Sequence, residues 1–203
     1  MTSTSLMHYL QALPRITDAE RLEVLNAAVD HMRKAIQQHG QLQLSFICTH
    51  NSRRSQFAQV WAWVLARQLG FANVQCYSAG TEATAVYPSV LSALQYAGLE
   101  IDQREAGSNP VFEVRIPGKE ETLTLFSKTV DHASNPKQGF LALMTCDQAY
   151  EACPIVPGAA HRIPLMYQDP KVADGTAFEG AKYAERSQQI ACEMNYIFEQ
   201  LNA

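Results

Sequence analysis

One stretch of the chain, LQLSFICTHNSRRSQFAQVWAWVLARQLG from Leu42 to Gly70, limits the possible folds more than any other. Its first part, residues 42–47, is an apolar run of strand length. Its last part, from about Ser55 to Leu69, carries apolar residues at helical spacing. A strand joined to a helix by a short loop is the first half of a βαβ unit. The stretch therefore predicts an α/β fold in which Cys48 follows the end of a buried strand.

The rest of the chain continues the alternation of strands and helices. Apolar segments of strand length occur at Val74–Gly80 and at residues 139–146, and the second predicts a central strand that ends at Cys146. Helical patterns cover residues 87–98 and about 179–201, and a short helix or loop is expected between Cys146 and Cys153. This order predicts a mostly parallel sheet with flanking helices.

Two segments lie outside this pattern. Residues 1–40 are expected to form an N-terminal helical extension, whose helix starts at a Thr-x-x-Glu capping box with Thr17 as the cap. Its apolar side is expected to pack on the domain or on a partner subunit, as in a homodimer. Within the main domain, residues 41–203, two alternating segments predict an inserted β-hairpin at about residues 111–126.

The composition narrows the classes of function. A chain of 203 residues with 47% hydrophobic content suits one buried core. The formal net charge of -4 offers no basic surface for nucleic acid or for an anionic membrane. The N-terminus lacks the pattern of a secretion signal, and no segment reaches the roughly 18 apolar residues of a membrane span. Five cysteines without framework spacing do not indicate a secreted disulfide scaffold. We therefore expect a cytoplasmic protein that acts on a small molecule or a protein.

Cys48 begins a Cys-x5-Arg loop that ends at Arg54 and is followed by Ser55. Ligands of open α/β sheets bind outside the carboxyl ends of the strands, and N–H groups at the start of a helix bind anions. The Arg54 guanidinium can contact two oxygens of a tetrahedral oxyanion and would favour the thiolate of Cys48. The pattern thus predicts a nucleophile beside its anionic substrate. The predicted oxyanion-binding residues are Thr49, His50, Asn51, Ser52, Arg53 and Arg54.

The segments FICTHNSRRSQFA and CYSAG, with the later Asp169-Pro170 pair, resemble the low-molecular-weight protein tyrosine phosphatase superfamily and, within it, the thioredoxin-coupled arsenate reductases. The resemblance extends over residues 42–170 with one interruption. It implies a four-stranded parallel sheet and a loop that binds arsenate, phosphate or sulfate. The implied residue roles are Cys48 as nucleophile, Arg54 as oxyanion ligand, Asp169 as proton donor, Ser55 as hydrogen-bond partner of the Cys48 thiolate, and Asn51 as support of the loop.

Cys146 and Cys153 favour the reductase branch. Reduction of arsenate needs two electrons, and thiols are the available donors. The resemblance implies that Cys48 attacks arsenate, that Cys146 then attacks Cys48, and that a final Cys146–Cys153 disulfide is reduced by thioredoxin. One continuous helix would separate residues 146 and 153 by about 10.5 Å along its axis. A disulfide needs Cα atoms within roughly 7 Å, so this segment is expected to unwind on oxidation.

Two other functions stay open at this point. A phosphatase would use Cys48 as nucleophile and Asp169 as acid toward phosphotyrosine or a small phosphate ester. Against tyrosine phosphatase activity, Lys171 and Val172 stand where aromatic residues usually follow the Asp-Pro pair. A non-catalytic regulator that only binds an oxyanion is the third possibility, because His50 stands where a glycine is usual and could distort the loop.

We expect neither a metal nor a cofactor. The Cys-x6-Cys pair of Cys146 and Cys153 lacks the spacing of zinc ligands. Gln59 replaces a glutamate that contributes to a potassium site in some reductases of this kind. Cys76 and Cys192 lie in no motif and are expected to be packing residues.

Overall fold

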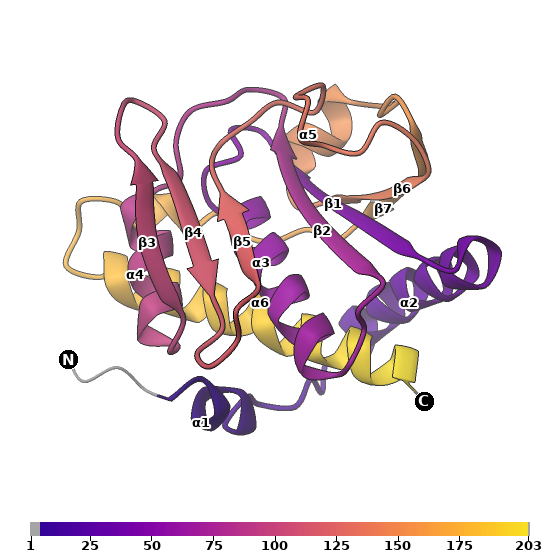
Figure 1. Ribbon diagram of the computed structural model, residues 1–203, viewed down its shortest axis with the longest axis horizontal. Helices are drawn as coiled ribbons and strands as arrows, with labels where there is room; N and C mark the ends of the chain where they lie inside the picture. Colours follow the sequence, from indigo (N-terminus) through magenta and orange to yellow (C-terminus); the bar gives the residue numbers. More distant parts are fainter. Residues whose placement is uncertain (1–4, 203) are drawn as a thin grey trace.

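The structure, a computed structural model, describes residues 5–202 (Figure 1). A parallel sheet with strand order β2-β1-β6-β7 lies beside an antiparallel sheet with order β3-β4-β5, which confirms the predicted α/β fold. Within the described residues, no helix combines the length and apolar content needed to cross a bilayer. The elements in chain order are α1 (Leu6–Gln11), α2 (Ala19–His39), β1 (Leu42–Cys48), α3 (Arg54–Gln68), β2 (Val74–Gly80), α4 (Pro88–Tyr96), β3 (Glu100–Glu105), β4 (Val111–Arg115), β5 (Thr122–Leu125), β6 (Phe140–Met144), α5 (Asp147–Ala152), β7 (Ala159–Pro164), the 3₁₀ turn η1 (Pro170–Ala173) and α6 (Glu179–Asn202).

The two faces of the parallel sheet are buried by different parts of the chain. Leu44 and Phe46 of β1 point into a large core that α2, α3 and α6 cover. Ile47 of β1 and Met144 of β6 point to the other face, where a smaller cluster packs against α5 and nearby loops. Successive side chains of a strand alternate between faces, so burial of both faces produces the continuous apolar runs seen in the sequence.

Helix α3 gives the site a rigid base. Its side chains are buried continuously from Ser55 to Ala66, as expected for a helix enclosed on all sides. It packs against β1, β2 and α6, and Trp61 Nε1 donates a hydrogen bond to Ser187 Oγ at 3.0 Å. The loop between β1 and α3 is therefore anchored at both ends.

Helix α2 packs on its own domain, because its apolar residues, among them Leu25 and Met32, are buried in the large core. Its N-terminal cap is Asp18 and not the predicted Thr17. The Asp18 carboxylate accepts the N–H of Arg21 at 3.2 Å. Asp caps a helix at least as well as Thr, so the helix begins one residue later than predicted.

The apolar pattern misses two edge strands. Strand β3, EIDQRE, is mostly exposed and pairs with β4, so the confirmed hairpin of β4 and β5 belongs to a three-stranded sheet. Strand β7, AAHRIP, pairs with β6 as the fourth parallel strand. Both are polar because most of their side chains are exposed or half-buried. The predicted central strand is β6, which ends at Met144 instead of Cys146.

Candidate active site

The segment that joins β1 to α3, residues 48–54, is called the oxyanion loop here, and its carbonyl groups face outward. The carbonyls of Cys48, Thr49 and Ser52 accept backbone N–H groups from residues 81–87 at 3.2, 2.9 and 3.1 Å. The peptide bonds of the described residues are trans, so the N–H group that follows each of these carbonyls points the opposite way. N–H groups directed at the centre of a loop form an anion-binding concavity.

Cys48 ends β1 with its sulfur 3.0 Å from Ser55 Oγ, in the first turn of α3. Asn51 Nδ2 donates to the same Ser55 oxygen at 2.8 Å. Because Asn51 supplies this donor, the hydroxyl hydrogen of Ser55 is free to point at the Cys48 sulfur. A hydrogen-bond donor at this position stabilises a thiolate. All three side chains are buried.

Asn51, and not His50, has the left-handed backbone of the loop. Among the described residues, Asn51 is the one non-glycine residue with a positive φ, 46°, a conformation that Asn tolerates better than most residues. The Asn51 Oδ1 accepts the N–H of Lys128 at 2.8 Å, which fixes the side chain. The His50 imidazole is partly exposed, with Nε2 3.6 Å from Glu82. The backbone of His50 is therefore not in the conformation that would favour a glycine at this position.

Residues 126–130, which follow the antiparallel sheet, support the oxyanion loop from one side. Ser127 Oγ donates to the His50 carbonyl at 3.0 Å. The Lys128 carbonyl accepts the N–H of Gly80 at 2.9 Å. Burial lowers the pKa of Lys128 to about 8. No sequence motif indicates these residues, because their loop partners lie 77 residues away along the chain.

Gly80 allows the oxyanion loop to pass close to the end of β2. A Cβ atom at this position would lie 2.6 Å from the Thr49 carbonyl oxygen and 2.7 Å from the Asn51 nitrogen. It would also lie 2.3 Å from the Glu82 carbonyl oxygen. These are backbone atoms, which cannot rotate away. Because the oxyanion loop passes this close to the end of β2, the CYSAG segment requires a glycine at position 80.

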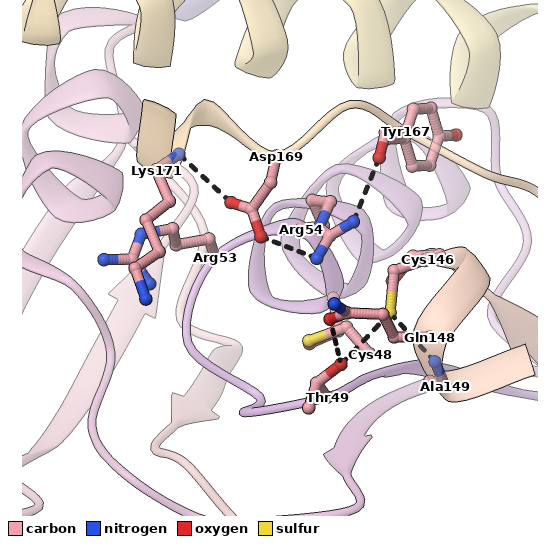
Figure 2. Close-up of polar contacts among 12 residues, drawn as sticks. Cys48, Thr49, Arg53, Arg54, Cys146, Gln148, Ala149, Tyr167, Asp169 and Lys171 are labelled. Carbon is pink, nitrogen blue, oxygen red and sulfur yellow. Dashed lines mark hydrogen bonds and ion pairs between the residues drawn. The ribbon is translucent and has the colours of Figure 1, made fainter. Parts of the chain in front are cut away.

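Arg54 and Asp169 are paired at the rim of the loop (Figure 2). Arg54 Nη2 donates to Asp169 Oδ2 at 2.6 Å, and Nη1 donates to the Tyr167 carbonyl at 3.1 Å. Asp169 also accepts the N–H of Lys171 at 3.1 Å. The buried Arg54 Nε has no hydrogen-bond partner among the described residues, which leaves a donor unused. The structure thus brings the predicted oxyanion ligand and the predicted proton donor together.

The Arg53 side chain is directed elsewhere. Its guanidinium donates to Asp174 at 2.6 Å and to the Tyr183 hydroxyl at 2.5 Å. It also lies 4.1 Å from the centre of the Tyr87 ring. The side chain therefore connects the loop to η1 and α6, and what Arg53 gives to the oxyanion loop is its backbone. Asp174 and Tyr183 are 121 and 130 residues away, so the sequence carried no signal of this contact.

Cys146 and Cys153 stand at the two ends of α5, and residues 146–153 are called the redox segment here. Cys146 caps the helix: its sulfur accepts the Ala149 N–H at 3.4 Å and lies 3.5 Å from Thr49 Oγ1 (Figure 2). Cys153 follows the last turn and is partly exposed. Both belong, with Cys48, to the smaller apolar cluster on one face of the sheet. The structure thus gathers three free thiols near the carboxyl ends of β1 and β6.

The other two cysteines are packing residues. Burial raises the pKa of Cys76 to about 12 and that of Cys192 to about 11, so both stay protonated thiols. Gln59 is buried and donates to the Cys76 carbonyl at 3.2 Å. Among the residues that the structure describes, no group of three or more His, Cys, Asp or Glu side chains could hold a metal ion.

Comparison with known proteins identifies a matching family model and relatives that are similar in sequence. A family model described as low molecular weight phosphotyrosine protein phosphatase matches residues 43–114. The arsenate reductase of Halalkalibacterium halodurans is 30% identical over 131 residues, which covers 64% of this chain and 76% of that protein. The arsenate reductase of Bacillus licheniformis is 29% identical over 141 residues, which covers 70% of this chain and 83% of that protein.

Solved structures show the same fold at low identity. Primo-1 superposes with a TM-score of 0.54 at 13% identity, covering 80% of this chain and 99% of that one. A YwlE mutant from Bacillus subtilis superposes with a TM-score of 0.52 at 16% identity, covering 80% of this chain and 100% of that one. The parallel sheet and its helices are therefore shared with these proteins.

Proposed function

This chain belongs to the low-molecular-weight protein tyrosine phosphatase superfamily, and on that premise we propose that it reduces arsenate to arsenite with its own thiols as electron donors. The observation that carries the proposal is the common cluster of Cys48, Cys146 and Cys153 on one face of the sheet. A phosphatase needs the first of these thiols but not the other two. The names of the curated relatives, arsenate reductases, support the same function.

The first step uses the oxyanion loop. Arsenate binds to the inward N–H groups and to Arg54, and the Cys48 thiolate attacks arsenic with loss of water. Ser55 supports the thiolate from 3.0 Å. Fixed donors around the anion stabilise the charge that develops as the sulfur–arsenic bond forms. The product of this step is a thiol–arsenate adduct on Cys48.

The next two steps are thiol chemistry. The Cys146 thiolate attacks the Cys48 sulfur, and the electron pair of the sulfur–arsenic bond stays with arsenic, which leaves as arsenite. This reduces arsenic by two electrons and forms a Cys48–Cys146 disulfide. Cys153 then attacks Cys146, which releases Cys48 as a thiolate and forms a Cys146–Cys153 disulfide. The position of Cys153 at the partly exposed end of α5 supports its role as the last thiol.

The proposal includes thioredoxin as the donor that reduces the Cys146–Cys153 disulfide, in a reducing cytoplasm. A homodimer is not needed for the reaction, because all the proposed site residues come from one chain. The apolar side of α2 also contacts its own domain and leaves no reason to seek a partner there.

Hydrolysis of a phosphate ester is the second candidate function, and one observation favours it. Asp169 is held at the rim by Arg54 and by the Lys171 N–H, where its protonated form could donate to a leaving oxygen. This reaction would use Cys48 as the nucleophile, and Cys146 and Cys153 would take no part in it. A protein that only binds an oxyanion would have use for neither the thiol cluster nor Asp169.

The test is arsenate-dependent consumption of NADPH by the purified protein with thioredoxin and thioredoxin reductase, beside release of p-nitrophenol from its phosphate ester. We expect catalytic arsenate turnover, lost in Cys48→Ser and kept in Cys192→Ala. Ester hydrolysis without arsenate turnover would assign the chain to the phosphatases. If the protein shows neither arsenate turnover nor ester hydrolysis but still binds phosphate, the hypothesis of a non-catalytic oxyanion-binding regulator would remain.

A further inference from the structure

The redox segment cannot form its disulfide in the conformation seen. Cys146 and Cys153 cap opposite ends of α5, and the Cys153 N–H donates to the Ala149 carbonyl at 3.1 Å. Seven residues of α-helix span about 10.5 Å, while disulfide-bonded Cα atoms lie within roughly 7 Å. The last turn of α5 has to open before the two sulfurs can meet.

Arg162 of β7 holds this last turn closed. Its Nη1 donates to the Pro154 carbonyl at 2.7 Å, and its Nη2 donates to the Tyr150 carbonyl at 2.5 Å. The guanidinium also lies 4.2 Å from the centre of the Tyr150 ring. Its two carbonyl partners lie on either side of Cys153 in the sequence. Opening of the turn would therefore separate Arg162 from at least one of them.

The chemistry of the contact suits a helix end. The last carbonyls of a helix have no partners within it, and a cation near them is stabilised by the helix dipole. Pro154 has no N–H with which to continue the helix. Arg162 is fixed by the sheet, where it pairs in register with Ala142 of β6. The two hydrogen bonds of Arg162 thus join the end of α5 to a strand of the parallel sheet.

We propose that Arg162 is a positioning residue that stabilises the reduced, helical redox segment and so limits how readily the Cys146–Cys153 disulfide forms. This inference rests on the proposed thiol sequence. In the affected step, the Cys153 thiolate attacks Cys146 within the Cys48–Cys146 disulfide. One sulfur–sulfur bond forms as another breaks, Cys48 leaves as a thiolate, and no net oxidation occurs.

The test measures the reduction potential of the Cys146–Cys153 pair in the full chain carrying Cys48→Ser, which leaves this pair as the reactive dithiol. The protein is equilibrated in buffers of reduced and oxidised dithiothreitol, and free thiols are counted by alkylation and mass spectrometry. Because opening of the turn would remove at least one of the Arg162 hydrogen bonds, Arg162→Ala should make the disulfide about tenfold more stable. This corresponds to a midpoint about 30 mV more negative.

Two variants accompany this measurement. Arg162→Lys keeps the charge without the bidentate geometry, and should give an intermediate shift. It also serves if Arg162→Ala does not fold. Arg115→Ala, which removes an arginine from the antiparallel sheet, should leave the potential unchanged. Backbone amide hydrogen exchange at residues 149–153 of the reduced protein should be faster in Arg162→Ala than in Arg115→Ala.

The outcomes separate the two proposals. Equal potentials and equal exchange in Arg162→Ala and its parent would overturn the role of Arg162, while wild-type arsenate turnover with thioredoxin would leave the proposed function standing. If the pair forms no disulfide in the parent or in either variant at any potential, the thiol sequence fails, and the role of Arg162 fails with it.

Discussion

The oxyanion loop and the redox segment carry reactive thiols at the same edge of the sheet, yet they are held in different ways. The carbonyls of the oxyanion loop are bonded to residues 81–87 and 126–130, and α3 fixes the end of the loop. The redox segment is one short helix whose last turn is held to the rest of the domain by Arg162. The loop of the first thiol is held by several segments of the chain, whereas the side-chain hydrogen bonds to the carbonyls on either side of the last thiol come from Arg162.

This difference matches the chemistry proposed for each region. A loop that stabilises developing charge must be organised before the substrate arrives, because reorganisation during the reaction would cost free energy. A thiol that passes a disulfide to a second protein must move. Regions with few buried contacts open at low free-energy cost, and this is what conformational change requires. The proposed chemistry therefore requires a rigid loop and a segment that opens, both at one edge of the sheet.

Removal of the nucleophile should have the largest effect. Cys48→Ser replaces a thiolate by a poorly nucleophilic hydroxyl, so arsenate reduction and phosphate-ester hydrolysis should each fall by at least about 10⁴-fold. Both rates are measured on the purified variant, with Cys192→Ala as the matched cysteine control. Substantial activity of either kind in Cys48→Ser would show that the reaction takes place elsewhere.

Removal of the last thiol should affect arsenate reduction and leave phosphate-ester hydrolysis nearly unchanged. In Cys153→Ser, the oxyanion loop stays intact, so phosphate-ester hydrolysis should stay within about twofold of the wild-type rate, because surface changes outside a site have small effects. Arsenate reduction should stop after one arsenite per protein molecule, because Cys48 stays bound to Cys146. Arsenite counted in a single-turnover assay decides this. Continued turnover with thioredoxin would mean that Cys153 is not part of the sequence of thiols.

Gly80→Ala should perturb the oxyanion loop and leave the redox segment unchanged. The new Cβ would overlap backbone atoms of the loop, so we expect a loss of about 1–3 kcal/mol in the free energy of unfolding. Displacement of the loop should lower both activities by about 100-fold. Gly180→Ala is the matched control, since a Cβ there meets no atom within 4 Å. Urea unfolding and both activity assays test this. Equal stability and activity of the two variants would contradict the close contact between Gly80 and the oxyanion loop.

The smallest effect concerns Lys128 and pH. Its pKa is about 8 in the folded protein, against 10.5 for a fully solvated lysine, because burial disfavours the charged form. Below pH 8 the charge is buried in the folded protein and destabilises it. Between pH 8 and 10.5 the unfolded chain binds more protons than the folded one, so stability rises with pH. Relative to Lys128→Met, the wild type should gain about 2 kcal/mol of unfolding free energy over this range. Urea unfolding near the two ends of this range measures it, and parallel curves would argue against a buried charge.

The fold was largely predictable where burial leaves a pattern in the sequence. Strands β1 and β2 and helices α3 and α6 follow from apolar runs or helical spacing, because each buries many of its side chains in the core. Strand β7 does not follow, because Ile163 is its one buried residue and the others leave no apolar pattern. Its absence from the prediction also concealed Arg162, the residue that contacts the redox segment.

The candidate site likewise contains residues that the sequence predicts and residues that it does not. The residues of the oxyanion loop are local in sequence, so the Cys-x5-Arg pattern located them together. The supports of the loop come from distant segments: Ser127 and Lys128 reach it across 77 residues, and Asp174 holds Arg53 across 121. Contacts at such separations depend on the tertiary fold, and a single sequence contains no pattern that reports them.

The proposed order of thiol reactions can be tested by identifying the disulfide that arsenate forms. The fully reduced wild-type protein is given one equivalent of arsenate without thioredoxin, quenched by alkylation, digested, and mapped by mass spectrometry. We expect a disulfide between Cys146 and Cys153, with Cys48, Cys76 and Cys192 alkylated. Five alkylated cysteines, or a disulfide that includes Cys76 or Cys192, would contradict it.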